Sequence, residues 1–449
     1  MRIVFKALIL LTVLMLVAGG SFLFLVKFEA HSPEVQVSGL PETAGRKFSF
    51  TVYAKDVRSG LREIEVALIQ GESRVLLKRE SFPVTFLKGS KVKEKSWPFE
   101  VEPLKLGLRE GEAYLLVKVR DASWREGLKG NLTEKRLKIK LDLTPPRVTL
   151  LSGTVYIARG GSALVLYKLN EQPSKSGIIV NDHFFMGYPL KNGVYAGLVA
   201  LPVEDKNVRR FVIYAEDKAG NALEIPVNYY LQKRHYTSFK MRISDGFLSR
   251  KMPEFISRYP EAQKASLIET FIWVNQTLRS ENNQKIVKIT SRASENTFTL
   301  KGAMLPLPHS AKRSDFGEFR TYYYKGRKVS SAWHQGLDLA SVARSPVPAA
   351  ADGRVVFADY LGIYGNTVII DHGLGLYTLY AHLAGLEISP GADVKRGQII
   401  GHTDTTGLAG GDHLHFSVIV QGVFVNPIEW LDPHWVKVRI LDPLKPYLN

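Results

Sequence analysis

Short runs of alternating apolar and polar residues recur between about residue 32 and residue 143. Clear examples are Phe48–Tyr53, Ile64–Leu68 and Tyr114–Val119, which are separated by glycine, proline and serine. Successive side chains point to opposite faces of a β-strand, so a period of two predicts strands with one buried face. Their length and spacing are typical of an antiparallel β-sandwich. We therefore expect a β domain over residues 32–143.

A weak internal repeat indicates a second β domain over residues 144–231. The segment Pro33–Val37 is echoed by Pro146–Leu150, and the second copy closes with the turn sequence Asp217–Asn221. These opening prolines and the closing Asp-x-Ala-Gly-Asn turn resemble bacterial immunoglobulin-like modules. The resemblance implies two immunoglobulin-like (Ig-like) β-sandwiches that serve as spacers or binding surfaces, with an envelope protein as a candidate partner.

The apolar period changes to three or four residues between residues 244 and 275. This spacing places the apolar side chains on one face of a helix, and Ser244 and Asp245 are suited to cap its start. The pattern resumes after Pro260, so we expect two short helices within a helical linker segment, residues 232–302. We interpret their aromatic stripe as core packed against a neighbouring domain. The first helical face consists of Phe247, Leu248, Met252, Phe255, Ile256 and Tyr259.

The amino-terminal residues predict a membrane span. Arg2 and Lys6 precede an uncharged apolar stretch, residues 7–26, and Lys27 ends it. As a helix, about 20 residues extend about 30 Å, the thickness of the hydrocarbon core of a bilayer. Basic residues before the span favour a cytoplasmic tail at residues 1–6 and place the bulk of the chain in the periplasm or cell exterior.

Two outcomes are open for this apolar stretch. The apolar core of a cleaved signal peptide is about 7–15 residues long and is followed by small residues at the cleavage site. Here the apolar run continues beyond the small residues Ala18–Ser21. An uncleaved, single-pass transmembrane anchor in the inner (cytoplasmic) membrane is therefore favoured, and cleavage is the alternative.

Composition narrows the chemistry open to the chain. Cysteine is absent, so any metal site must use histidine, aspartate or glutamate, and thiol nucleophiles are excluded. The formal net charge is +17, and nearly all of the basic excess lies in residues 1–300 without long runs of like charge. A solvated surface is the favoured interpretation, and attraction to anionic lipid or cell-wall polymer comes second. No nucleic-acid recognition motif accompanies the charge, so no nucleic-acid partner is expected.

Histidines concentrate in the last third of the chain, where strand-like runs and glycine-containing turns return. Eight of the eleven lie beyond residue 300. His413 and His415 are two residues apart, so they share one face if they lie on a strand. His334 and Asp338 are close enough in sequence to converge, and His382 ends an apolar strand. Such groups can supply the three protein ligands that a catalytic zinc site commonly has.

This region resembles the lysostaphin-type (M23, LytM-like) zinc metallopeptidases. The resemblance covers residues 303–430 and implies an antiparallel β peptidase domain at residues 303–433, followed by a C-terminal tail at residues 434–449. The matching segments are, in order, Ser314–Gly317, His334–Leu339, Ser345–Ala350, Gly353–Val355, Tyr380–Leu383, Val394–Gln398 and His413–Phe416.

The resemblance also implies the residues of the site. One zinc ion per chain would be bound by His334, Asp338 and His415. His382 and His413 would be catalytic residues that do not bind the metal. In that assignment His413 accepts a proton as general base, and His382 stabilises the developing oxyanion.

The chain departs from the family pattern at two points. Ala409–Asp412 stands where Ser-Thr-Gly often precedes the histidine pair, and Ser417 stands where glutamate often follows it. None of these is a metal ligand, so the departures bear on the substrate-contacting loops. Arg320 and Tyr322–Tyr324 are candidates to line a peptide groove, although core or surface positions are equally expected. His372, at a strand-to-turn junction, is expected to be structural.

The resemblance implies a membrane-anchored zinc metalloendopeptidase that hydrolyses peptide cross-links of bacterial peptidoglycan in cell-wall remodelling. The alternative is a non-catalytic LytM-like regulator that activates a cell-wall amidase, but the complete set of site residues favours the enzyme. The expected fold is mainly β, with an N-terminal transmembrane helix, two β-sandwich modules, a short helical segment and the peptidase domain. Residues 232–302 are a candidate cover for the substrate groove.

Overall fold

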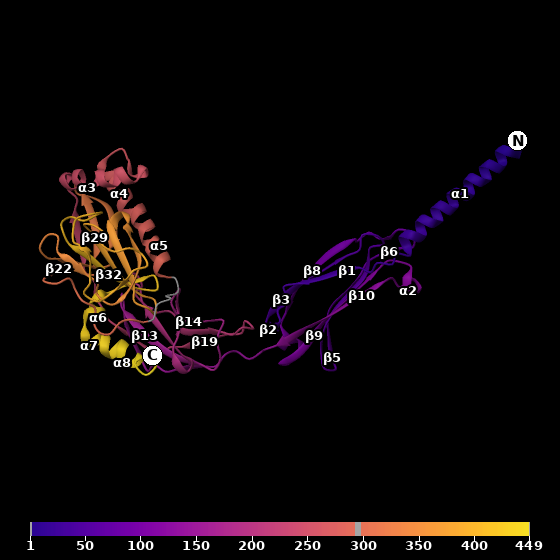
Figure 1. Ribbon diagram of the computed structural model, residues 1–449, viewed down its shortest axis with the longest axis horizontal. Coiled ribbons are helices and arrows are strands. Elements are labelled where there is room, and N and C mark those ends of the chain that lie inside the picture. Colours follow the sequence, from indigo (N-terminus) through magenta and orange to yellow (C-terminus); the bar gives the residue numbers. More distant parts are fainter. Residues whose placement is uncertain (1, 292–297, 449) are drawn as a thin grey trace. The chain divides into compact units, whose positions relative to one another are not determined.

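The computed structural model describes residues 2–291 and 298–448 (Figure 1). Contacts between Cα atoms divide the chain into two compact units. The first unit contains Met1–Pro146 with Glu216–Leu223, and the second contains Arg147–Ala215 with Glu224–Asn449. The fold is mainly β, as expected. The finer division into two separate Ig-like modules, a linker and a peptidase domain stays a prediction.

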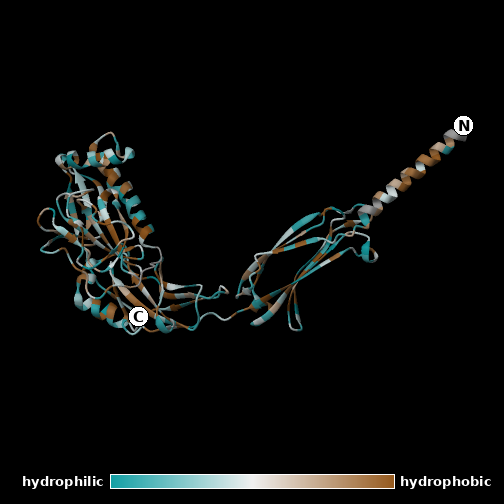
Figure 2. Cartoon of the chain, viewed as in Figure 1, coloured by the Kyte–Doolittle hydropathy of each residue, from teal (hydrophilic) through white to brown (hydrophobic). Residues whose placement is uncertain are grey.

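Helix α1 (Arg2–Lys27) contains the apolar stretch expected at the amino terminus, coloured brown in Figure 2. Its window Phe5–Phe22 has a mean hydropathy of 2.0, and it is long and apolar enough to cross a membrane. The window has no buried surface within the structure, so its side chains are free to face lipid. Among the described residues, no other helix meets this test of length and composition.

The rest of the first unit consists mainly of two β-sheets that share one hydrophobic core. One sheet has the order β1-β3-β8 and the other the order β2-β10-β9-β4-β5. In β3 the burial alternates strictly, with Phe50 and Val52 facing the core that Ile64 of β4 and Val117 of β9 also enter. The predicted strands at Phe48, Ile64 and Tyr114 are thus confirmed. The strands and short helices of this unit are β1 (Glu34–Ser38), β2 (Thr43–Ala44), β3 (Phe48–Lys55), β4 (Leu61–Gln70), β5 (Ser73–Ser81), β6 (Val84–Thr85), β7 (Gly89–Ser90), β8 (Glu94–Val101), a 3₁₀ helix (Pro103–Leu106), β9 (Gly111–Asp121), α2 (Arg125–Leu128) and β10 (Leu132–Leu141).

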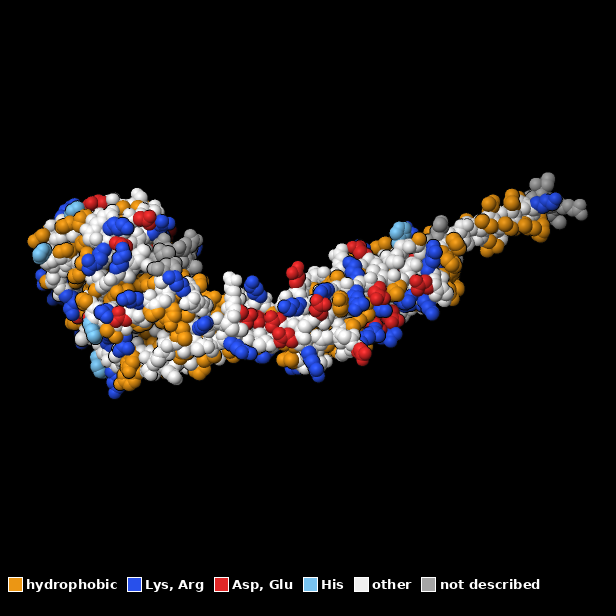
Figure 3. All heavy atoms as spheres, turned by 60° about the horizontal axis from the view of Figure 1, so that its bottom comes forward, with side chains coloured by type: hydrophobic (Ala, Val, Ile, Leu, Met, Phe, Trp, Pro, Cys, Tyr) orange, Lys and Arg blue, Asp and Glu red, His pale blue; other side chains and the backbone are white. Residues whose placement is uncertain are grey.

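Basic side chains on these sheets are interspersed with acidic ones, as Figure 3 shows for one face. Cross-strand pairs account for part of the pattern: Lys118 lies 3.0 Å from Glu134, and Arg79 lies 3.1 Å from Glu63. Exposed ion pairs of this kind contribute little stability, about 0–1 kcal/mol each. This distribution agrees with a solvated surface as the explanation of the basic excess.

The second unit begins with two four-stranded sheets, of order β11-β13-β17-β16 and β15-β14-β18-β19, and a parallel pair of β12 and β20. The predicted turn joins β18 to β19, where Asp217 accepts hydrogen bonds from the backbone N–H groups of Ala219 and Asn221. The strands are β11 (Val148–Leu150), β12 (Val155–Ala158), β13 (Ser162–Leu169), β14 (Lys175–Val180), β15 (His183–Met186), β16 (Tyr188–Pro189), β17 (Val194–Ala200), β18 (Phe211–Glu216), β19 (Ala222–Pro226) and β20 (Tyr229–Gln232), with a 3₁₀ helix at Lys191–Gly193.

An antiparallel eight-stranded sheet dominates the rest of this unit. Its order is β22-β25-β32-β29-β28-β27-β30, with β33 paired to β32. The segment β21 (Ser238–Arg242) extends a second sheet by pairing in parallel with β23. The remaining strands are β22 (Ala311–Ser314), β23 (Phe319–Tyr324), β24 (Arg327–Trp333), β25 (Leu337–Ala340), β26 (Pro346–Pro348), β27 (Gly353–Tyr360), β28 (Asn366–Asp371), β29 (Leu376–Leu383), β30 (Asp393–Val394), β31 (Ile399–His402), β32 (Leu414–Val420) and β33 (Val423–Val425), with a 3₁₀ helix at Gly362–Tyr364.

The helical segment contains one more α-helix than predicted. Helix α3 (Asp245–Arg258) begins where expected, because the Ser244 side chain accepts a hydrogen bond from the N–H of Phe247. After a 3₁₀ turn at Pro260–Ala262, α4 (Leu267–Trp273) continues through a π-helical turn (Val274–Leu278) into α5 (Arg279–Thr290). The third helix was missed because its exposed face is strongly polar and leaves few apolar positions, chiefly Ile286, to mark a period.

The described part of the predicted C-terminal tail, residues 434–448, forms short helices. They follow α6 (Pro427–Leu431) and comprise α7 (Pro433–Val436), a π-helical turn (Lys437–Leu441) and α8 (Asp442–Leu444). Their buried residues Val436, Ile440 and Leu444 are four positions apart, which is the spacing of one helical face and a signal present in the sequence.

A buried ion pair joins α6 to earlier parts of the same unit. Glu429 accepts a hydrogen bond from the backbone N–H of Ser162 on β13 and lies 3.0 Å from Arg234. Burial raises the pKa of Glu429, and the Arg234 guanidinium opposes that rise. Residues 147–215 and 224–449 thus share polar contacts as well as one hydrophobic core.

His372 lies in the turn between β28 and β29 and is fully buried. Its Nδ1–H donates to the Asp352 carbonyl at 2.7 Å, and its Nε2 lies 2.8 Å from the Thr378 hydroxyl. Burial lowers the pKa of His372 to about 4. These contacts support the structural role expected for this residue.

This buried histidine predicts a loss of stability in mild acid. The unfolded chain protonates a histidine near pH 6.5, whereas folded His372 does so near pH 4, so the free energy of unfolding falls as the pH drops through this window. Between pH 7 and pH 5 the loss is about 2 kcal/mol. Urea unfolding of the wild type should show this extra loss relative to His372→Gln, while exposed His434→Gln should follow the wild type. Equal pH dependence of the wild type and His372→Gln would contradict the prediction.

Candidate metal centre and catalytic residues

Two neighbouring strands carry two of the three predicted metal ligands. Asp338 on β25 is directly opposite His415 on β32 in the antiparallel register. Ser314 on β22 is opposite Asp338 on the other side. Because directly opposed residues of an antiparallel pair are separated by only about 4.5–5.5 Å, the sheet itself brings the carboxylate and the imidazole together.

The third predicted ligand, His334, comes from the turn between β24 and β25. Its backbone N–H donates to the Glu318 carbonyl, and its carbonyl accepts from Gly317, which ties the turn to the start of β23. Gly336 in the same turn packs directly on His415: a Cβ at this position would lie 2.6 Å from the His415 Nε2. Any larger residue would therefore push the turn away from His415.

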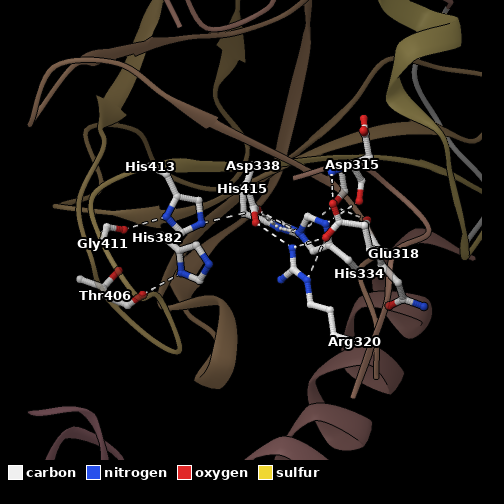
Figure 4. Close-up of polar contacts among 12 residues, drawn as sticks. Asp315, Glu318, Arg320, His334, Asp338, His382, Thr406, Gly411, His413 and His415 are labelled. Carbon is white, nitrogen blue, oxygen red and sulfur yellow. Dashed lines mark hydrogen bonds and ion pairs between the residues drawn. The ribbon is translucent and has the colours of Figure 1, made fainter. Parts of the chain in front are cut away.

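Three ligand atoms converge at one point (Figure 4). The His334 Nε2 lies 2.9 Å from the Asp338 Oδ1 and 3.1 Å from the His415 Nδ1, which is in turn 3.0 Å from the Asp338 Oδ1. Tetrahedral ligands at about 2.0 Å from zinc lie about 3.3 Å apart. The three atoms are thus spaced almost as a metal would hold them, and all three residues are buried.

Hydrogen bonds on the far side of each imidazole fix which nitrogen faces this point. The His334 Nδ1 is 2.8 Å from the Asp315 carbonyl, which can only accept, so Nδ1 carries the proton. The Ser417 hydroxyl donates to the Gln335 carbonyl at 2.8 Å and lies 3.1 Å from the His415 Nε2. Because the hydroxyl proton of Ser417 is used in the bond to Gln335, the Ser417 oxygen accepts a hydrogen bond from the His415 Nε2–H.

When both imidazoles are neutral, the His334 Nε2 and the His415 Nδ1 therefore present lone pairs to the Asp338 carboxylate. Three electron-rich atoms about 3 Å apart repel one another unless a cation or extra protons lie between them. Burial, opposed by Asp338, lowers the pKa of His415 to about 4 and disfavours its protonation. This donor set fits a divalent metal ion.

The second oxygen of Asp338 is held by an arginine. The Arg320 Nη2 on β23 lies 3.2 Å from the Asp338 Oδ2 and 3.1 Å from Glu318, which also accepts from the backbone N–H of Asp315. Burial opposes ionisation of Asp338, but His334 and the other histidines around it hold its pKa well below the usual range. Asp338 is therefore an oriented, ionised carboxylate with one oxygen left for a metal.

His413 and His382 lie beside the three ligand residues, with ring centroids 4.8 Å apart. The His413 Nδ1–H donates to the Gly411 carbonyl at 2.8 Å, and its Nε2 is 3.5 Å from the Asp338 Oδ1. Burial opposes charge on His413, but Asp338 outweighs it and raises the pKa of His413. The His382 Nδ1–H donates to the Thr406 carbonyl at 2.7 Å.

The backbone of His382 is in an unusual conformation, with φ of +63°. It occupies a bulge in β29, where the pairing with β28 shifts between Asn366 and Val368. Bulges next to functional sites redirect side chains, and a non-glycine residue in the left-handed region costs about 1–3 kcal/mol. The strained bulge turns His382 towards His413 and thus serves the site rather than the sheet.

A cleft of about 770 Å³ opens over these residues. Its floor includes all five predicted site residues, and one wall comes from β21, α3 and α4 through Met241, Phe247 and Phe271. The segment predicted to be a linker is therefore a wall of the cleft.

Helix α3 also holds the loop behind His382. Glu254 accepts hydrogen bonds at 2.9 Å from the backbone N–H of Gly407 and from the Tyr360 hydroxyl. Lys251 donates to the Thr405 carbonyl. Because this loop supplies the Thr406 carbonyl, α3 supports the orientation of the His382 ring.

Comparison with known proteins identifies the fold that carries this centre. Residues 332–427 match the model of the family described as Peptidase family M23. The chain carries a peptidase M23 domain. The matched residues include all five of those predicted for the site, and the predicted family resemblance is confirmed.

Curated relatives match only part of the chain. The chain is 38% identical over 125 residues to the DD-carboxypeptidase/endopeptidase Mpg of Neisseria meningitidis, and this match covers 27% of each protein. It is 40% identical over 96 residues to the peptidoglycan DD-endopeptidase ShyA of Vibrio cholerae, covering 21% of this chain and 22% of that protein. It is 37% identical over 97 residues to the murein hydrolase activator EnvC of Escherichia coli K12, covering 22% of this chain and 23% of that protein. The chain thus spans about a quarter of the length of these relatives.

The structure brings all five predicted residues of the M23 domain together, whereas their individual roles stay predictions. The sequence reasoning missed two kinds of group. Glu318 and the orienting role of Arg320 depend on the pairing of β23 with its neighbours. The carbonyls of Asp315 and Thr406 are backbone groups and have no sequence signal at all.

The contact between Ser417 and His415 generates a test that does not depend on activity. Ser417→Ala removes the acceptor of the His415 Nε2–H, and loss of such an outer partner lowers metal affinity by about 10–100-fold. Competition with a chromophoric zinc chelator, using the full chain, measures this change. Exposed Ser389→Ala is the matched control and should bind zinc like the wild type. Unchanged zinc affinity in Ser417→Ala would contradict an orienting role.

Proposed function

We propose that the protein is a membrane-anchored zinc metalloendopeptidase that hydrolyses peptide cross-links of bacterial peptidoglycan. The observation that carries the proposal is the convergence of three buried ligand atoms within about 3 Å of one another, next to two further histidines in an open cleft. The printed names of relatives at 38% and 40% identity, a DD-carboxypeptidase/endopeptidase and a peptidoglycan DD-endopeptidase, support the choice of substrate.

In this proposal, His334, Asp338 and His415 would hold the zinc ion, and the bound ion would supply Lewis acidity towards the scissile carbonyl and the attacking water. Arg320 and Ser417 keep the carboxylate and the imidazole of the site in their binding orientations. His413 has its Nδ1–H on the Gly411 carbonyl, so its Nε2 is free to take a proton from the attacking water.

The hydrogen bond of the His382 Nδ1–H restricts when this residue can stabilise the oxyanion. Its Nδ1–H is committed to the Thr406 carbonyl, so it donates towards the substrate only when Nε2 carries a second proton. Burial first, and His413 and His415 second, lower the pKa of His382 well below the usual range. The neutral ring therefore predominates at neutral pH. Once its Nε2 has received the proton that His413 takes from the attacking water, His382 is an acid strong enough to stabilise the developing oxyanion and to pass that proton to the leaving amine.

The remaining parts of the chain fit an enzyme that works on the cell wall. Helix α1 would anchor the chain in the inner membrane, with the basic residues Arg2 and Lys6 in the cytoplasm and the bulk of the chain in the periplasm or cell exterior. The β-sandwiches would act as Ig-like spacers that carry the M23 domain towards peptidoglycan. An envelope protein is a candidate partner for their surfaces.

A non-catalytic regulator is the second candidate, because a murein hydrolase activator is among the relatives. An activator needs neither a metal nor free histidines in its cleft. This chain has the three ligand residues, both additional histidines and the outer partners that orient them. The complete set supports the enzyme over the regulator.

The proposal predicts different losses for the ligand and the catalytic histidines. His415→Ala should lose zinc and activity together, because a ligand is removed. His413→Ala and His382→Ala should keep near-stoichiometric zinc and lose activity by about 10²–10⁴-fold, because proton transfer is removed. Elemental analysis and the rate of fragment release from purified peptidoglycan measure the two effects for the full chain in detergent.

The exposed His434→Ala is the matched control and should retain both zinc and activity. Loss of zinc in His413→Ala with retention in His415→Ala would reverse the assignment. A wild type that binds zinc but releases no fragments, while it stimulates a purified amidase, would favour the regulator.

A further inference from the structure

We propose that the arginine-rich wall of the cleft binds free carboxylates of the peptide substrate, so that the enzyme selects acidic cross-linking peptides over neutral ones. This inference rests on the proposed function, because it concerns the substrate of the same cleft. It names a binding surface that is separate from the metal ligands and from the two catalytic histidines.

Five arginines line the cleft, and they come from five different elements. Arg242 ends β21, Arg250 lies on α3, Arg279 begins α5, and Arg313 and Arg320 lie on β22 and β23. Only two acidic residues, Asp338 and Asp412, are among the residues that line the same cleft. No single helix or strand face explains this concentration of one charge.

Four of the five arginines are not neutralised by the protein. Arg320 is paired with Glu318 and Asp338. Within residues 2–291 and 298–448, no ion pair with a carboxylate is formed by Arg242, Arg250, Arg279 or Arg313. Elsewhere on the chain, exposed arginines such as Arg79 and Arg354 do have carboxylate partners. Other described arginines outside the cleft, such as Arg327 and Arg439, also form no ion pair with a carboxylate. The feature that distinguishes this surface is therefore the concentration of such arginines around one cleft.

The two acidic lining residues offset this charge only in part. Asp338 is the metal ligand, so its charge is directed to the metal. Asp412 accepts a hydrogen bond from the backbone N–H of Arg344. With a divalent cation in place the cleft becomes more positive still, which favours an anionic ligand.

Arg279 lies deepest of the four unpaired arginines. It is half-buried, and its Nε and Nη2 both donate to the Asn275 side-chain oxygen, which fixes the plane of the guanidinium. Arg279 and Tyr364 both line the cleft. The Tyr364 ring is 5.6 Å from that of His415. A carboxylate bound by Arg279 would thus lie in the same cleft as the predicted metal ligands.

The geometry of arginine explains why carboxylate is the expected ligand. A guanidinium presents a planar fork of N–H donors that matches the two oxygens of a carboxylate, and charged hydrogen bonds of this kind are stronger than neutral ones. Peptidoglycan stem peptides carry free α-carboxylates on D-glutamate and at the D-alanine terminus. A bridge made only of glycine carries none along its length. The cleft therefore predicts selection of stem-peptide cross-links over neutral glycine bridges.

Binding of two matched probes tests this inference. The first is fluorescein-labelled L-Ala-γ-D-Glu-L-Lys-D-Ala-D-Ala with both carboxylates free, and the second is the same peptide with both converted to carboxamides. Fluorescence anisotropy with the zinc-loaded full chain in detergent gives the two dissociation constants. Chromatography of the same samples reports hydrolysis. The wild type should bind the carboxylate probe at least about 10-fold more tightly, and salt should weaken this preference.

Variants then assign the preference to the arginines. Arg279→Gln should reduce the carboxylate preference by about 10- to 100-fold, and Arg279→Lys should restore part of it, because charge returns without the fork. Arg250→Gln provides an independent variant on another element. Exposed Arg327→Gln, on β24 outside the cleft, is the matched control and should behave as the wild type. Circular dichroism and zinc content verify that each variant is folded.

The outcomes separate this inference from the proposed function. Equal binding of both probes by the wild type, or a full preference retained in both Arg279→Gln and Arg250→Gln, would overturn the inference. A preference that depends on Arg279, in samples that show no hydrolysis of either probe or of peptidoglycan, would support the carboxylate site and contradict the enzyme. A preference for the carboxylate probe in both binding and hydrolysis supports both the carboxylate site and the proposed enzyme activity.

Discussion

The convergence of three lone-pair-bearing atoms is the constraint on which the rest of the site depends. His334, Asp338 and His415 bring two nitrogens and one oxygen to within about 3 Å of one another in a buried position. Such an arrangement is unfavourable without a positive charge at its centre. Two neighbouring groups hold the ligands in this arrangement: Arg320 contacts the second carboxylate oxygen of Asp338, and Ser417 lies behind His415.

The β-sheet meets this constraint through register and two local irregularities. Direct pairing of β25 with β32 brings Asp338 opposite His415, and Gly336 allows the turn with His334 to pack on the His415 ring. The bulge in β29 turns His382 towards the same cleft. Helix α3 then supports the loop that carries the Thr406 carbonyl, so the helical segment belongs to the architecture of the site.

The resemblance to M23 peptidases implied the five site residues, and the alternation of apolar and polar residues predicted the mainly β fold. His413 and His415 are two apart, and the alternation in β3, β4 and β9 is strict enough to identify strands. Local sequence patterns could not predict the parallel pairing of β21 with β23, since this contact joins residues about 80 positions apart. The carbonyl groups behind His334 and His382 belong to every residue type, so no pattern distinguishes them. The buried face of Val436, Ile440 and Leu444, by contrast, has a helical spacing that is present in the sequence.

The central claim is that exactly these three side chains hold one zinc ion. X-ray absorption at the zinc edge, on the zinc-loaded full chain, counts the ligands directly. Two imidazole nitrogens and oxygen ligands at about 2.0–2.1 Å are predicted, with the same spectrum for His413→Ala and His382→Ala. Three or more imidazoles in the wild type, with one fewer in His413→Ala or His382→Ala, would contradict the assignment, as would a full chain that binds no zinc.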